Sequence, residues 1–287
     1  MYSKRISKSF ESASEIEFSE RDKFVIFSDI HRGTGDVNDN FAANQNIFFY
    51  ALSSYYDKGY TYIELGDGDE LWENKRIEPI IAEYCHIFWL IDKFHRDGRM
   101  IMLYGNHDIV KRSEKWRSAH ISKLPTDSHC SLESILDGAE ISETLILRNS
   151  DSGKAYYLIH GHQAELLNSS FWRLSKFLVR HIWRPLESLG VKQPLGTAEH
   201  RAKMEKTEKR LINWCKETGN SLIAGHTHRP RFPDGEAEYF NAGSCVHPRC
   251  VTAIEIAYGA VNLVKWSVEP DGSILRITRT ELETIII

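Results

Sequence analysis

Two residues directly after the first apolar run of the sequence could bind a cation. Asp29 and His31 follow the β-prone run 24–28 and are separated by one residue. A buried parallel strand reads as a continuous hydrophobic run, and its carboxyl end is where α/β sheets place ligands. Alternate residues leaving such a strand could direct a carboxylate oxygen and an imidazole nitrogen at one ion. Because a polar pair at a strand end often only starts a loop, its meaning depends on the rest of the chain.

Similar polar endings recur after four later strand-like runs. Aspartate, asparagine and histidine without cysteine form a mixed nitrogen and oxygen ligand set, which suits Mn, Fe, Zn or Co better than a thiolate zinc site. About seven such ligands are too many for one tetrahedral ion, but they suit two ions that share a carboxylate. A further candidate is the loop 241–244, near His247 and Arg249. In order, the endings are Asp29 with His31, Asp67, Asn106 with His107, His160 with His162, and His226 with His228.

The elements between these endings predict a mainly parallel sheet. Strand, loop, helix and strand at this spacing are typical of βαβ units. The stretch 111–142 is interpreted as loops and short helices. Without a repeat or a long linker, we expect a single domain over 1–287, with a helical insertion at about 163–218. Strands are expected at 24–28, 60–65, 99–104, 155–159 and 221–224, helices at 41–58 and about 79–96, and further β segments at 238–241, 251–257, 261–267 and 274–279.

Composition excludes several classes of protein. The 287 residues are 41% hydrophobic and 26% charged, which is ordinary for a globular domain. The formal net charge of −4 gives no general attraction to nucleic acid, so no stable nucleic-acid partner is expected. The five widely spaced cysteines argue against a disulfide framework and favour reduced thiols in a cytoplasmic protein. The polar segment 1–21 has no signal-peptide core, and no run approaches a transmembrane helix.

The motifs resemble those of the calcineurin-like metallophosphoesterase family over residues 24–266. That family carries, in order, Asp-x-His, Gly-Asp-x-x-Asp/Glu, Gly-Asn-His-Asp/Glu, His-Gly and Gly-His-x-His, and every block is present here. Within the family, residues 66–72 and 225–230 look most like the UDP-2,3-diacylglucosamine pyrophosphatase branch. That branch has an aspartate at the place of His162.

The resemblance implies a fold and a metal centre. The expected fold is a four-layer α/β/β/α sandwich with a helical insertion. One metal would take Asp29, His31 and His228. Asp67 would bridge to a second metal, whose ligands are Asn106, His160 and His226. Whether His160 or His162 is the ligand stays open, with His160 preferred because it directly follows the strand.

The resemblance also implies metal-dependent hydrolysis of a phosphoester or pyrophosphate bond, with water as the acceptor. His107 would stabilise or protonate the leaving oxygen, and Asp108 would orient it. The expected substrate is a small phosphorylated molecule, because the insertion could restrict access. Its expected contacts are Arg32, Asn106 and His162, with weaker support for Arg229, Arg249 and His247.

Other interpretations remain open. With the same ions the protein could be a protein Ser/Thr phosphatase or a nuclease, and in another class a non-catalytic metal-bound scaffold. The stretch 171–184 combines an apolar helical stripe with arginines and a lysine. It could be a lid, a peripheral membrane contact, an insertion helix packed on its neighbours, or a homodimer interface.

Overall fold

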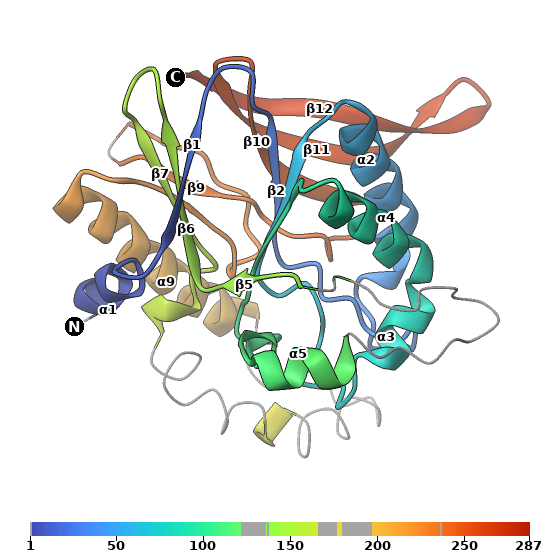
Figure 1. Cartoon of the computed structure of the whole chain (residues 1–287). Coiled ribbons are helices and arrows are strands. Elements are labelled where there is room, and N and C mark those ends of the chain that lie inside the picture. The colour runs from blue at the N-terminus through green and yellow to red at the C-terminus, as the bar shows by residue number, and fades with distance from the viewer. Residues whose placement is uncertain (1, 122–135, 137, 166–176, 180–196, 236) are drawn as a thin grey trace.

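Two sheets pack face to face between two layers of helices (Figure 1). The computed structural model describes residues 2–121, 136, 138–165, 177–179, 197–235 and 237–287. Three apolar clusters separate the four layers, since one lies between the sheets and one lies under each helical layer. The expected α/β/β/α architecture is therefore confirmed.

The larger sheet has seven strands and carries the first three motifs. Its order is β12-β11-β10-β2-β3-β4-β5. Strand β2 is buried over its full length, because helices cover one face and the other sheet covers the second, and this explains its continuous apolar run. Strands β2 to β5 are parallel, and the others are antiparallel. The bounds are β2 Phe24–Phe27, β3 Thr61–Leu65, β4 Met100–Leu103, β5 Ile141–Ser142, β10 Cys250–Ala257, β11 Ala260–Asp271 and β12 Ile274–Ile286.

The smaller sheet has five strands in the order β1-β6-β7-β8-β9 and carries the two histidine motifs. Two of these strands, β1 and β6, were not expected from the sequence. Strand β1 lies at the sheet edge and is mostly exposed, so it lacks the apolar pattern of a buried strand. The bounds are β1 Ser14–Phe18, β6 Thr144–Asn149, β7 Ala155–Ile159, β8 Ser221–Ala224 and β9 Tyr239–Asn241.

The helices cover the two outer faces. Helices α2 and α4 lie outside the larger sheet, and α1 and α9 lie outside the smaller one (Figure 1). The helix expected at 79–96 is divided at Tyr84, whose backbone leaves the helical region. The bounds are α1 Tyr2–Ser9, α2 Gln45–Asp57, α3 Glu78–Glu83, α4 Cys85–Arg96, α5 Glu114–His120 and α9 Thr197–Thr218, with 3₁₀ turns at Ala42–Asn44, Ile109–Arg112 and His162–Ala164.

Half of the predicted insertion, residues 166–176 and 180–196, lies outside the described residues. This holds for the stretch 171–184 apart from 177–179, so its proposed lid, membrane and dimer roles stay predictions. Helix α9 forms the last part of the helical segment expected at 163–218. Within the described part of the chain, every helix is too short or too polar to cross a membrane.

The cysteines differ in oxidation state. Cys215, Cys245 and Cys250 are free thiols, whereas Cys85 is disulfide-bonded. The expectation of reduced thiols is therefore wrong at Cys85. Spacing along a sequence is a poor guide here, because folding can bring distant cysteines together.

Candidate metal centre

All five polar endings meet at one edge of the sandwich. They follow β2, β3, β4, β7 and β8. Among these strands, β2 pairs with β3, β3 with β4, and β7 with β8, each in parallel. Five of the seven expected ligands share a left-handed backbone, with φ between 52° and 69°. Non-glycine residues adopt this conformation at a cost, and such strain concentrates at functional sites. These residues are Asp29, His31, Asp67, His226 and His228.

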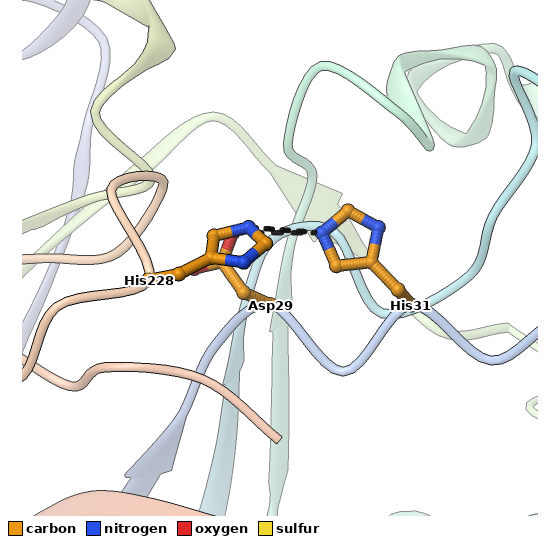
Figure 2. Close-up of side chains that lie close together, drawn as sticks. All are labelled: Asp29, His31 and His228. Atoms are coloured by element: carbon orange, nitrogen blue, oxygen red, sulfur yellow. Dashed lines mark hydrogen bonds and ion pairs between the residues drawn. The ribbon is translucent and has the colours of Figure 1, made fainter. Parts of the chain in front are cut away.

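The first group of donors consists of Asp29, His31 and His228, whose ligand atoms lie within 4.8 Å of one another. Figure 2 shows ring nitrogens of the two imidazoles pointing toward each other. Their Nε2 atoms are 3.3 Å apart. Asp29 Oδ1 lies 3.1 Å from His228 Nε2 and 3.7 Å from His31 Nε2. Its other oxygen accepts hydrogen bonds from the Ser28 hydroxyl and the His226 backbone. One carboxylate oxygen is thus held by the protein, and the other is directed at the two nitrogens.

The second group consists of Asp67, His160 and His226. His160 Nδ1 donates a hydrogen bond to the Leu65 carbonyl at 2.9 Å, and Nε2 lies 3.1 Å from Asp67 Oδ2. Asp67 Oδ2 also lies 3.8 Å from His31 Nε2, so this carboxylate stands between the two groups. His162 is buried outside the group, with 5.6 Å between its ring centroid and that of His160. The geometry supports His160 over His162 as the ligand.

Three buried atoms of the expected ligands fit a cation. Within the described part of the chain, Asp29 Oδ1, Asn106 Oδ1 and His160 Nε2 have no hydrogen-bond partner. Leaving such atoms unpaired is costly, whereas an amide oxygen and an imidazole nitrogen both coordinate divalent ions. The donor set therefore fits a pair of metal ions.

The charges of the site favour ionised carboxylates. Burial raises the pKa of Asp29 and of Asp67, but neighbouring imidazoles outweigh it and hold both pKa values below the ordinary range. Burial lowers the pKa of His160, but Asp67 and Asp29 outweigh it and raise this pKa to about 9. The carboxylates thus make the centre of the site attractive to positive charge.

Glu70, to which the sequence analysis assigned no role, contacts two important histidines. Its carboxylate lies 2.7 Å from His107 Nδ1 and 3.0 Å from His31 Nδ1. Burial lowers the pKa of His107, but the carboxylates of Glu70 and Asp67 outweigh it and raise this pKa. The available signal was the final glutamate of the Gly-Asp-x-x-Asp/Glu block.

The role expected for Asp108 is wrong. Its carboxylate accepts hydrogen bonds from the backbone N–H groups of Gly105, at 2.7 Å, and Gly68, at 3.1 Å, and forms an ion pair with Lys111. It fastens two motif loops together, and Glu70 takes the position beside His107. Neighbouring positions in the sequence did not imply neighbouring side chains.

The substrate contact expected for Arg32 is also wrong. Its side chain is fully buried, with Nε 2.7 Å from Asp69 and Nη2 2.9 Å from Glu64. Because the guanidinium is buried and forms ion pairs with two carboxylates, it does not reach a substrate in the cavity. Arg229, Arg249 and His247 do not line the cavity described below, although His247 Nε2 lies 2.7 Å from the His228 carbonyl.

Glu165 is a second contact that the sequence analysis missed, and no motif marks it. Its Oε1 lies 3.2 Å from His226 Nε2 and accepts a hydrogen bond from Thr207 on α9. Its Oε2 lies 3.2 Å from Lys203. Helix α9 is thereby tied to the second donor group.

The donor groups open into a cavity of about 360 Å³. Among the described residues, its walls combine histidines, carboxylates and amides with the apolar side chains of Trp72, Met204 and Val246. Among the described residues that line the cavity, Lys203 is the only lysine, and there is no arginine. The volume suits a small molecule. Five of the seven expected ligands line the cavity, namely His31, Asp67, Asn106, His226 and His228.

The model of the calcineurin-like phosphoesterase family matches residues 22–230. No curated protein sequence matches the chain. Solved structures similar to it include vacuolar protein sorting 29 from Cryptosporidium parvum, with 12% identity, coverage of 91% of this chain and 97% of that chain, and a TM-score of 0.40. They also include Vps29 from Chaetomium thermophilum, with 9% identity, coverage of 93% and 98%, and a TM-score of 0.41. The calcineurin-like phosphoesterase YfkN from Bacillus subtilis has 9% identity, coverage of 91% and 90%, and a TM-score of 0.35.

Proposed function

The chain belongs to the calcineurin-like phosphoesterase family, and we propose that it hydrolyses a phosphoester or diphosphate bond of a small phosphorylated molecule with two divalent cations. The observation that carries this proposal is the position of Asp67 between two groups of metal-capable side chains. Asp29, His31 and His228 would hold one ion, and Asn106, His160 and His226 the other. Asp67 would be shared. Mixed nitrogen and oxygen donors favour Mn, Fe, Zn or Co at both positions.

The ions, when bound, would supply an activated water and neutralise charge on the phosphoryl group. His107 supplies the remaining proton chemistry. Because Glu70 engages its Nδ1, Nε2 is the nitrogen available to the cavity. As the bond between phosphorus and the leaving oxygen breaks, Nε2 of protonated His107 donates its proton to that oxygen. The carboxylate of Glu70 favours the protonated ring beforehand and holds its Nδ1.

Lys203 is proposed as a substrate contact in place of Arg32. It lies on the cavity wall, and its side chain is 49% exposed while paired with Glu165. A lysine in this position can contact a phosphate oxygen without losing its carboxylate partner.

Replacing Lys203 with methionine is expected to raise KM about tenfold and to leave kcat nearly unchanged, since one charged hydrogen bond is worth about 1.5 kcal/mol. Steady-state kinetics on a phosphomonoester measures this. Lys206→Met is the matched control, because Lys206 is exposed on the same helix and does not line the cavity. Equal kinetics for the two variants would contradict the assignment.

Metal analysis together with a substrate panel tests the function. Protein purified with Mn, Fe, Zn or Co is expected to contain two ions per chain and to hydrolyse small phosphate esters only when metal-loaded. The panel contains phosphomonoesters, phosphodiesters and sugar-nucleotide diphosphates, the last because residues 66–72 resemble the UDP-2,3-diacylglucosamine pyrophosphatase branch. Phosphopeptides and DNA are included. Exclusive cleavage of either would replace the small-molecule proposal, and an inert metal-loaded protein would favour a non-catalytic scaffold.

A further inference from the structure

The imidazole of His107 is held by a single turn, residues 67–74. Asp67 Oδ1 accepts a hydrogen bond from the His107 backbone N–H at 2.8 Å, and Glu70 lies 2.7 Å from Nδ1. The indole of Trp72 stacks on the ring, with 4.2 Å between the centroids and 18° between the planes. One turn therefore contacts the backbone, the edge and the face of His107.

Residues within this turn are also hydrogen-bonded to one another. Glu70 Oε1 accepts hydrogen bonds from the backbone N–H groups of Trp72, at 3.2 Å, and of Glu73, at 3.3 Å. Trp72 is only 4% exposed, although its side chain borders the cavity. The direction of the carboxylate and the position of the indole consequently depend on each other.

A hydrogen bond at one ring atom does not determine the plane of an imidazole. The second side-chain torsion of histidine is broad and nearly two-fold, so the ring could rotate about its contact with Glu70 and move Nε2. A parallel aromatic face restricts this rotation. The ring of His31 also contacts His107, but it does so edge-on, at an interplanar angle of 85° and a centroid distance of 4.7 Å.

We propose that Trp72 is a positioning residue for proton transfer, because its stacked indole fixes the plane in which His107 directs Nε2 at the leaving oxygen. The inference rests on the proposed hydrolase function. Trp72 contributes no proton and no metal ligand. Its loss should therefore affect substrates according to how much their leaving group needs a proton.

Leaving-group dependence provides the test. For Trp72→Leu, kcat on phenyl phosphate, a poor leaving group, is expected to fall about tenfold to a hundredfold, because a small misplacement of a catalytic group is costly. On p-nitrophenyl phosphate, whose leaving group needs little protonation, kcat should fall less than about threefold. Trp72→Phe keeps a stacking ring and should restore most of the rate on phenyl phosphate. Elemental analysis should find the wild-type metal content in both variants.

Trp214→Leu is the matched control, because Trp214 is also buried but stacks on Phe10, donates a hydrogen bond to Ser7 on α1 and does not line the cavity. It should leave the ratio of the two rates unchanged. An equal loss on both esters in Trp72→Leu, or an unchanged rate on phenyl phosphate, would overturn the inference.

A crystal structure of Trp72→Leu tests the inference without any activity measurement. The expected result is a His107 ring whose plane is rotated so that Nε2 is displaced, and a ring in its original orientation would overturn the positioning role. Inactivity of the metal-loaded wild-type protein toward the whole substrate panel would instead count against the hydrolase function.

Discussion

Asp67→Asn is expected to abolish hydrolysis and to weaken the binding of both metal ions. Asp67 Oδ2 lies 3.1 Å from His160 Nε2 in one donor group and 3.8 Å from His31 Nε2 in the other. An amide has the same shape but no charge, so both ions would lose a shared anionic ligand. The loss of several kcal/mol of stabilisation corresponds to a fall in kcat of about a thousandfold or more.

Elemental analysis and isothermal titration with Mn²⁺ measure the effect on the metals separately from the rate. Asp151→Asn is the control, because it removes one carboxylate from an exposed turn and should change neither quantity. Two tightly held ions in Asp67→Asn would refute the shared-ligand assignment, even if activity were lost.

Lys111→Met is expected to lower the free energy of unfolding by about 3–5 kcal/mol, because it leaves buried carboxylates without a cation. Lys111 Nζ lies 2.7 Å from Asp69 and 2.8 Å from Asp108, and all three side chains are almost completely buried. Burial raises the pKa of Asp108, and the ammonium of Lys111 is the strongest opposing influence. Without it, Asp108 would hold the loops of Gly68 and Gly105 less firmly.

Urea denaturation of the metal-free protein measures this effect without a contribution from bound ions. Lys115→Met, at an exposed position on α5, should change the free energy of unfolding by less than about 0.5 kcal/mol. The coupling free energy between Lys111 and Asp69 can be isolated by comparing Lys111→Met and Asp69→Asn with the double variant Lys111→Met/Asp69→Asn, which removes one charge of each sign. Full stability of Lys111→Met would show that the buried cluster does not need its ammonium.

The sequence by itself determined the donor residues and the strands that carry them. The runs before Asp29, Asp67 and His160 are apolar because β2, β3 and β7 are largely buried, and burial leaves a direct mark on composition. Parallel strands end at the same edge, so recurrent polar endings predicted one site before any coordinates were known. The order of the motifs indicated the family that the comparison confirms.

Only the tertiary structure decided which side chains touch. Arg32 follows the first motif directly, yet its side chain is buried against Glu64 and Asp69, because the loops after β2 and β3 run side by side. His107 meets Glu70, from another loop, and not the adjacent Asp108. The sequence of edge strand β1 shows little apolar patterning, because the strand is mostly exposed. Burial is recorded in the types of residues along the chain, whereas a contact between two loops depends on backbone paths that no local pattern records.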